Sequence, residues 1–230
     1  MAIPDIAPYQ IPTGPFAERV NWELDPSRAA LLVHDMQRYF IDAYQPEAEP
    51  IATALPNMVR IREACSRAGV PVVYTAQPGD QHPSRRGILK DFWGHGLESG
   101  PDEEIVAELA PRLGDITVTK WRYSGFQRTD LRDLLVQHRR DQLIVVGVYA
   151  HMGCMISATE AFMSDVAPFF VVDAMADFSR DEHQMAAEYI GKRAGRVQTA
   201  DQIVQILEAA APAADSDQID AEAFDGAASA

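Results

Sequence analysis

The chain has 230 residues, of which 47% are hydrophobic, and this favours one large α/β domain over two small ones. The formal net charge of −14 argues against nucleic-acid binding, which needs a basic surface. No apolar run reaches the roughly 18 residues of a membrane helix, and the proline-containing N-terminus lacks a signal-peptide pattern, so a cytoplasmic location is expected.

Apolar segments of strand length alternate with helical patterns along the chain. Residues 1–28 are rich in proline and are predicted to form an extended arm over the domain surface or a neighbouring subunit. Apolar runs predict strands at 29–33, 70–74, 116–119, 142–147, 168–172 and 197–199. Helices are predicted at 51–68 with Gly69 as its C-cap, at 129–138 with Thr129 as its cap, at 151–165, after the Ser179–Glu182 capping box, and at 200–211.

This alternation predicts right-handed crossovers and a three-layer αβα fold of the Rossmann-like kind. Its central six-stranded sheet is expected to be mainly parallel, with helices on both faces. The catalytic domain is expected to span 29–211. Residues 212–230 are acidic and rich in Ala, Asp and Ser, which predicts a disordered tail.

Polar residues follow several of the predicted strands, where ligands bind in parallel sheets. They are Asp35, Gln77, Lys120, Tyr149 with His151, and Asp173 or Asp177. Asp35 reads equally as a structural acid or helix cap, and Lys120 as a surface lysine at a strand end. Because both end strands of one sheet, we expect the two side chains to form a pair.

Residues 147–154 (GVYAHMGC) follow the fourth strand and enter a helix, a junction that offers backbone N–H groups to an anion. An ordinary tight turn would have the same sequence. The glycines do not match a dinucleotide or phosphate-loop motif, so no cofactor is predicted. No metal is predicted either, because metal-ligand spacing is missing among His34, His82, His95, His138, His151 and His183.

Two further features leave alternatives open. Residues 85–94 (RRGILKDFWG) combine basic and aromatic side chains and could form either a solvated loop or a lid that supplies a guanidinium to a carboxylate. Cys65 and Cys154 are expected to be free thiols, because two cysteines of a cytosolic protein seldom form a disulfide.

Together these segments resemble the isochorismatase-like hydrolases over nearly the whole of residues 29–207. The similar segments are 32–37 (LVHDMQ), 74–78 (YTAQP), 89–94 (LKDFWG), 119–124 (TKWRYS), 147–151 (GVYAH) and 176–183 (ADFSRDEH). They look most like the subgroup that acts on isochorismate or 2-amino-2-deoxyisochorismate in siderophore, phenazine and related antibiotic biosynthesis.

The same superfamily contains nicotinamidases and other amidases with a nucleophilic cysteine after the fourth strand. When the segments are lined up on Gly147, that cysteine falls on Gly153, and Cys154 lies one residue away. The resemblance therefore favours the vinyl-ether branch, with a Cys154-dependent amidase as the alternative. It also implies a non-proline cis peptide bond between Val148 and Tyr149.

The resemblance implies acid catalysis without a cofactor or a protein nucleophile. Asp35 would protonate the methylene carbon of the enolpyruvyl ether, and Lys120 would hold Asp35 and the substrate. The substrate-binding set would be Gln77, Arg86, Tyr149 and Gly153, with Arg86 chosen over Arg85 because it directly precedes Gly87. Lys120 should lower the pKa of Asp35, so we expect Asp35 to gain its proton mainly in the substrate complex.

Two expectations concern partners. The substrate is expected to be a small anion, which needs a local basic pocket in this acidic chain. The resemblance suggests a homodimer. A carrier or interaction module is the non-enzymatic alternative, but the acidic tail is too short to be a fused carrier domain.

Overall fold

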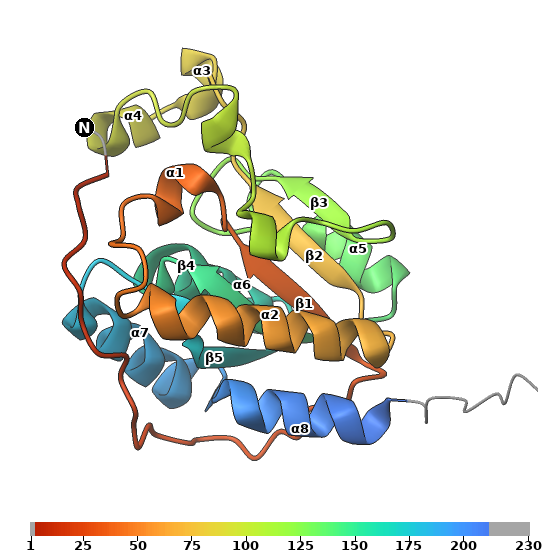
Figure 1. Ribbon diagram of the computed structural model, residues 1–230. Helices are drawn as coiled ribbons and strands as arrows, with labels where there is room; N and C mark the ends of the chain where they lie inside the picture. Colours follow the sequence, from red (N-terminus) through yellow and green to blue (C-terminus); the bar gives the residue numbers. More distant parts are fainter. Residues whose placement is uncertain (1–2, 212–230) are drawn as a thin grey trace, which may run out of the picture.

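The computed structural model describes residues 3–211, and these form a single six-stranded sheet between two layers of helices (Figure 1). The strands are β1 (Ala29–His34), β2 (Val72–Ala76), β3 (Ile116–Thr119), β4 (Gln142–Val148), β5 (Ala167–Ala176) and β6 (Arg196–Gln198). Their order is β3-β2-β1-β4-β5-β6, and every neighbouring pair is parallel. The predicted three-layer parallel fold is confirmed.

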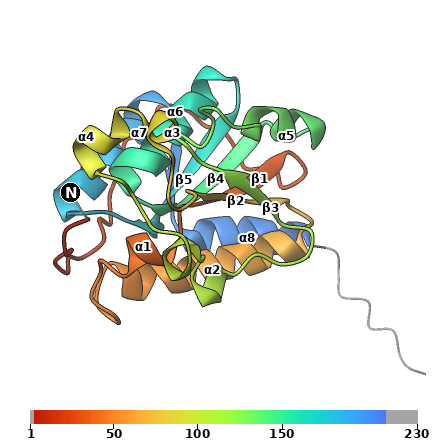
Figure 2. The same ribbon diagram turned by 90° about the horizontal axis from the view of Figure 1, so that it is seen from above.

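The two helical layers are clear when the molecule is seen from above (Figure 2). Helices α2 (Ile51–Arg67) and α8 (Ala200–Ala210) cover one face of the sheet, and their apolar side chains belong to one buried cluster. Helices α5 (Leu131–Gln137), α6 (Met155–Met163) and α7 (Arg180–Arg193) cover the other face and form a second cluster. The sheet therefore has a core on each side.

The central strands explain why the apolar runs in the sequence are continuous. All residues of β1 and β4 are buried, because both faces of these strands lie under helices. Val33 of β1 pairs with Tyr74 of β2 and Val146 of β4, so the strands end at nearly the same level. Burying each large aliphatic side chain contributes about 1.5–3 kcal/mol.

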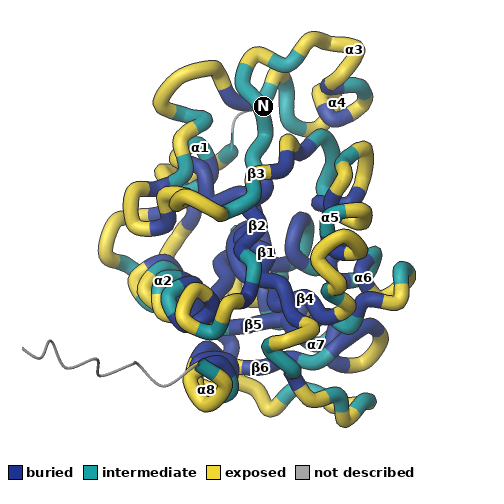
Figure 3. The backbone as a smooth tube through the Cα atoms, turned by 90° about the vertical axis from the view of Figure 1, so that its right-hand side faces the viewer, coloured by how far each residue is buried: buried dark blue, intermediate teal, exposed yellow. Residues whose placement is uncertain are grey.

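Three short helices lie beyond the carboxyl ends of the strands: α1 (Arg38–Ile41), α3 (Pro83–Arg86) and α4 (Leu89–Trp93). Two 3₁₀ turns follow, at Pro101–Glu103 and Ala107–Leu109. Much of this upper region is exposed, whereas the sheet below it is buried (Figure 3). Sequence periodicity does not reveal helices of four or five residues, because a single turn has no repeat to detect.

Most element boundaries were predicted within two residues, with three corrections. Strand β2 begins at Val72, two residues after the predicted start, although the Pro71 carbonyl accepts the amide of Leu31. Helix α5 begins at Leu131 with Asp130 in the N-cap position, and the Thr129 hydroxyl oxygen accepts the Leu131 amide while its hydroxyl donates to the Gly125 carbonyl. Strand β5 extends to Ala176, so Asp173 lies inside the strand.

The junction after β4 also differs from the predicted uniform helix at 151–165. A π-helical turn, Ala150–Cys154, precedes α6, which ends at Met163. Gly147 has φ +119°, and a Cβ there would lie 2.2 Å from the His34 carbonyl oxygen. Glycine therefore allows β1 and β4 to approach closely at the position where the register between β4 and β5 shifts.

One predicted cap is present and the other is displaced by one residue. The C-cap of α2 is Ala68, and Gly69, which was predicted in that role, follows it with a positive φ of +67°. Ser179 accepts the Glu182 amide and donates its hydroxyl to the Glu182 carboxylate, which begins α7.

The N-terminal arm runs along the outside of the molecule without regular structure (Figure 1). Ile6 donates its amide to Ala43, and Tyr9 donates its amide to Glu49, so backbone hydrogen bonds fasten the arm to the body. The predicted tail, 212–230, lies outside the described residues. Among residues 3–211, no helix is both long and apolar enough to span a membrane.

Candidate active site

Asp35, Gln77 and Lys120 directly follow β1, β2 and β3, which are neighbours in the sheet. Because parallel strands end at one edge, the three side chains meet there. They line one pocket together with Arg86, Tyr149 and Gly153, so all six predicted site residues lie around the same cavity.

Asp35 is buried at the base of this pocket and makes hydrogen bonds through both carboxylate oxygens. Its backbone φ is +49°, a conformation that aspartate tolerates better than most residues. Oδ1 accepts the Thr75 hydroxyl at 2.7 Å. Oδ2 accepts the Gln77 amide at 3.1 Å and lies 2.9 Å from Lys120 Nζ. The carboxylate is thus held from three directions.

These contacts determine the charge state of Asp35 in the unliganded protein. Burial acts to raise the pKa of Asp35, but the charge of Lys120, the electrostatic effect of His34 and the hydrogen bonds from Lys120 and Thr75 outweigh it, so the pKa lies below its usual range. Lys120 also donates to the Arg122 carbonyl at 2.7 Å, which fixes its ammonium group. The free site therefore contains an ion pair at neutral pH.

Gln77 connects Asp35 to Arg86 of helix α3. Gln37 clamps the backbone of Gln77 from both sides: its side chain accepts the Gln77 amide at 2.7 Å and donates to the Gln77 carbonyl at 2.8 Å. The Gln77 side chain then donates to Asp35 and accepts from Arg86 Nη1 at 3.3 Å. A rigid backbone thereby directs one amide towards both charged groups.

Arg86 and Arg85 have different environments although they are adjacent in α3. Arg86 is 5% exposed, lines the pocket and donates through Nε to the Gly94 carbonyl at 3.1 Å. Arg85 is exposed and lies over the Trp121 ring. Of the two interpretations of residues 85–94, the pocket lining favours a lid, because Arg86, Leu89 and Trp93 of this segment line the pocket and Arg85 does not.

The turn after β4 supplies Tyr149 and Gly153. The peptide bond between Val148 and Tyr149 is cis, as the resemblance implied. The Tyr149 hydroxyl donates to the Phe40 carbonyl at 3.3 Å, so the ring, not the hydroxyl, is the part free to face the pocket.

Cys154 does not line this pocket. It packs in the core among residues of α6 and β5, and burial raises the pKa of its thiol well above the usual value.

Aromatic side chains form the walls of the pocket. The Phe178 ring lies 4.2 Å from the Tyr149 ring and is stacked on Trp93 at 6.0 Å, and Trp93 donates to the Tyr123 hydroxyl. Further apolar lining comes from Ile3, Tyr39, Phe40, Leu89, Val148 and Met152. Sequence reasoning assigned no role to these residues. Trp93 and Phe178 lie in family-like segments and could have been found there, whereas nothing in the sequence places Ile3 of the arm at a pocket.

The charge of the pocket is opposite to that of the whole chain. Among its lining residues, Arg86, Lys120 and Arg122 are cationic and Asp35 is the one acid. With an overall formal charge of −14, the chain thus concentrates positive charge where a small anion would bind.

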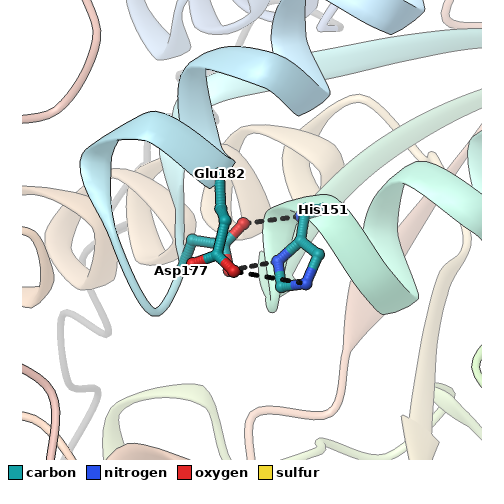
Figure 4. Close-up of side chains that lie close together, drawn as sticks. All are labelled: His151, Asp177 and Glu182. Atoms are coloured by element: carbon teal, nitrogen blue, oxygen red, sulfur yellow. Dashed lines mark hydrogen bonds and ion pairs between the residues drawn. The ribbon is translucent and has the colours of Figure 1, made fainter.

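A second polar cluster lies beside the turn (Figure 4). Asp177, named above as one of two candidates, accepts the His151 amide and its ring Nδ1, each at 2.6 Å, and the Phe178 amide at 2.8 Å. Burial acts to lower the pKa of His151, but the hydrogen bond and charge of Asp177 raise it. Glu182 Oε1 lies 4.0 Å from His151 Nε2. The Asp177 oxygens are already engaged by N–H donors, so we describe the cluster as a clamp on the turn. Neither Asp177 nor the other candidate, Asp173, lines the pocket, and Asp173 accepts the Ala200 amide at the start of α8.

Comparison with known proteins agrees with this arrangement. A protein-family model described as an isochorismatase domain matches residues 29–202. An isochorismatase from Bacillus subtilis is 50% identical over 211 residues, covering 90% of this chain and 68% of that protein. The phenazine biosynthesis protein PhzD of Pseudomonas fluorescens is 49% identical over 210 residues, covering 88% of this chain and 98% of that protein.

Two other similar proteins extend the comparison. Enterobactin synthase component B of Escherichia coli K12 is 44% identical over 200 residues, covering 86% of this chain and 70% of that protein. Among solved structures, a cysteine hydrolase from Pseudomonas syringae pv. phaseolicola superposes with a TM-score of 0.76 at 25% identity, covering 83% of this chain and 97% of that one. The fold is thus shared with a protein described as a cysteine hydrolase.

Proposed function

Because this chain belongs to the isochorismatase family, we propose that it hydrolyses the enolpyruvyl ether of isochorismate or of 2-amino-2-deoxyisochorismate. The products are pyruvate and either a dihydrodiol, 2,3-dihydro-2,3-dihydroxybenzoate, or its amino analogue, 2,3-dihydro-3-hydroxyanthranilate. The names of the similar proteins support this reaction and a place in siderophore or phenazine biosynthesis.

The observation that carries the proposal is the buried Asp35–Lys120 pair at the base of an aromatic, positively charged pocket. Aromatic walls suit a cyclohexadiene ring, and the cationic groups suit its carboxylates. The described lining offers no thiol, and vinyl-ether hydrolysis needs none.

The reaction proceeds by protonation at carbon. Asp35 transfers its proton to the terminal methylene carbon, and the electrons of the double bond form the new C–H bond. The resulting oxocarbenium ion is attacked by water, which returns a proton to Asp35. The hemiketal then collapses: its hydroxyl loses a proton as the carbonyl of pyruvate forms. The bond between the hemiketal carbon and the ether oxygen breaks, and that oxygen stays on the ring and takes up a proton.

The remaining site residues bind and orient the substrate. Lys120 contacts the ether oxygen or a carboxylate while it holds Asp35, and Arg86 pairs with a carboxylate. Gln77 lies between the two and orients both. Tyr149 supplies an aromatic face, and the backbone at Gly153 borders the cavity without a side chain.

Because the pKa of Asp35 is lowered in the free protein, the carboxylate becomes protonated only when the substrate binds. The substrate carries two carboxylates, and their approach makes the ionised form of a buried acid less favourable. Closing the aromatic walls around the ligand also removes water from the pocket. Both effects raise the pKa of Asp35 in the complex.

The Cys154-dependent amidase finds no support in the geometry. Cys154 is fully buried, it faces the α6 side of the sheet, and burial keeps its thiol protonated. A thiol in that position has no access to the Asp35–Lys120 pair through the pocket described above.

Two finer points belong to this proposal. We keep the homodimer as a hypothesis supported by exposed apolar side chains on the neighbouring helices α6 and α7, namely Phe162, Met163, Met185 and Tyr189. The buried free thiols of Cys65 and Cys154 support a cytoplasmic location. Light scattering of the purified chain tests the first point.

The direct test is turnover by the purified chain on each of the two substrates, with pyruvate measured by a coupled lactate dehydrogenase assay. Pyruvate release from one or both is expected, and the ratio of the two kcat/KM values identifies the natural substrate. Nicotinamide serves as the control for amidase activity and should release no ammonia. Absence of pyruvate with both substrates would overturn the proposal.

A further inference from the structure

His34, the last residue of β1, is the unassigned residue with the most informative surroundings. It is 1% exposed, and its ring lies between two backbone carbonyls. Nδ1 is 2.9 Å from the Val148 oxygen, and Nε2 is 3.2 Å from the Tyr123 oxygen. The ring thus contacts the segment after β4, which carries Tyr149, and the segment after β3, which carries Lys120.

The ring also fills the space beside Gly153. A Cβ built on Gly153 would lie 2.0 Å from His34 Cε1, 2.6 Å from Nδ1 and 2.7 Å from Nε2. These three ring atoms are its nearest neighbours, and contacts under 3.0 Å essentially never occur. Any side chain at position 153 therefore requires the His34 ring to leave.

Displacing the His34 ring from this position costs free energy. Moving it removes the ring from the Val148 and Tyr123 carbonyls, so a buried hydrogen bond is lost. The backbone of His34 is also closely packed, since a Cβ on Gly147 would lie 2.2 Å from its carbonyl oxygen. His34 is consequently fixed in the volume that a residue-153 side chain needs.

Position 153 is where the resemblance places the nucleophilic cysteine of the amidases. We propose that His34 is a specificity-determining residue: its ring excludes a protein nucleophile from the space beside Asp35 and Lys120, and so commits the pocket to protonation at carbon. This inference rests on the proposed function, which it deepens by explaining why one fold performs two chemistries.

The proposal predicts a latent acyl-transfer site. In a His34→Ala, Gly153→Cys variant, the new thiol occupies the space vacated by the ring, close to Asp35 and Lys120. With p-nitrophenyl acetate, Asp35 accepts the thiol proton and the sulfur attacks the ester carbonyl. A C–S bond forms, the C–O bond breaks, and p-nitrophenolate leaves with its electron pair. Water then cleaves the thioester.

The first experiment is a double-mutant cycle on the full chain, read by urea unfolding. Gly153→Ala should lower the unfolding midpoint strongly in the wild-type background and much less in the His34→Ala background. His183→Ala provides the matched control, because His183 is equally buried but is not among the neighbours of Gly153. Additive costs, or a double variant that fails to fold when His34→Ala alone folds, would overturn the proposal.

The second experiment measures the latent chemistry. It uses His34→Ala, Gly153→Cys combined with Cys154→Ala, so that residue 153 carries the one thiol near the pocket. A burst of one equivalent of p-nitrophenolate is expected, with an acetyl group on the peptide containing residue 153. The matched variant with Gly153→Ser should give no comparable burst. A folded thiol variant without burst or acetylation overturns the proposal.

The two proposals fail differently. The unfolding cycle involves no substrate, so coupling between His34 and Gly153 together with absent pyruvate release would reject only the proposed function. Pyruvate release with additive costs would reject only the role of His34.

Discussion

Lys120 Nζ lies 2.9 Å from Asp35 Oδ2, and the two side chains are 3% and 5% exposed. A pair buried so completely loses much of its hydration, and removing one partner leaves the other charge uncompensated. Protonation of Asp35 in the proposed reaction would neutralise one of the two charges of this pair. The protonation state of Asp35 therefore affects both the stability of this edge of the sheet and the proposed chemistry.

Replacing Asp35 with Asn should separate binding from chemistry. Asn keeps the shape and can still contact Thr75 and Lys120, but it has no proton to give to carbon. We expect kcat to fall about 10²–10⁴-fold, the usual contribution of a positioned acid, while substrate affinity measured by calorimetry is retained. Asp201→Asn, at an exposed position, is the control. Substantial turnover by the Asp35→Asn enzyme would remove Asp35 from its assigned role.

The pH dependence follows from the depressed pKa of Asp35. In the free protein the group is ionised at neutral pH, so the reactive form must gain a proton. The value of kcat/KM should then fall as pH rises, by about tenfold per unit.

Proton uptake can be measured directly. Binding of an unreactive analogue with a lactyl ether in place of the enolpyruvyl group should take up about one proton, seen as a buffer-dependent enthalpy, and Asp35→Asn should abolish the uptake. If kcat/KM stays constant from neutral to alkaline pH and no proton is taken up on binding, the free protein already holds the reactive proton, which would contradict this prediction.

Arg86→Lys should impair substrate binding more than Arg85→Lys. The Arg86 guanidinium bonds Gly94 and Gln77 at once, and a lysine cannot make both contacts while pairing with a carboxylate. Losing a charged hydrogen bond costs about 1.5–3 kcal/mol, which corresponds to a rise in KM of about 10–150-fold. The neighbouring Arg85 is exposed, so its variant should have nearly wild-type kinetics; equal effects would contradict the inward assignment of Arg86.

His183 should make the protein sensitive to acid. Burial lowers its pKa to about 4 from 6.5. The neutral ring donates through Nε2 to Val172 and accepts from the Tyr9 hydroxyl through Nδ1. Between these pKa values the unfolded state binds more protons, so stability falls as pH drops from 6.5 towards 4, by up to about 3 kcal/mol.

The measurement is the free energy of unfolding in urea at several pH values. His183→Gln should be less stable near neutral pH but should lose this part of the pH dependence. His82→Gln, at an exposed position, should retain it. Parallel pH profiles for the wild type and His183→Gln would contradict the assignment.

The sequence predicted the sheet well because its central strands are buried on both faces and appear as uninterrupted apolar runs. The polar residues after β1, β2 and β3 could be placed together for the same reason, since parallel strands end at one edge. The choice between Asp173 and Asp177 could not be made, because a bulge at Gly147 and the extra length of β5 are decided by packing. The roles of Gln37 and His34 depend on contacts between segments far apart in the chain, which no local pattern encodes.

The N-terminal arm brings Ile3 to the pocket, and Tyr9 of the same arm bonds Asp177, the residue that clamps the catalytic turn. Ile3 thus lies at the pocket, whereas α8 lies at the opposite end of the molecule from α4 (Figure 1). A bulky group attached to the arm near Ile3 would crowd the entrance, and one attached to the exposed side of α8 would leave it facing the solution. The choice of attachment point will therefore influence how much activity an immobilised preparation retains.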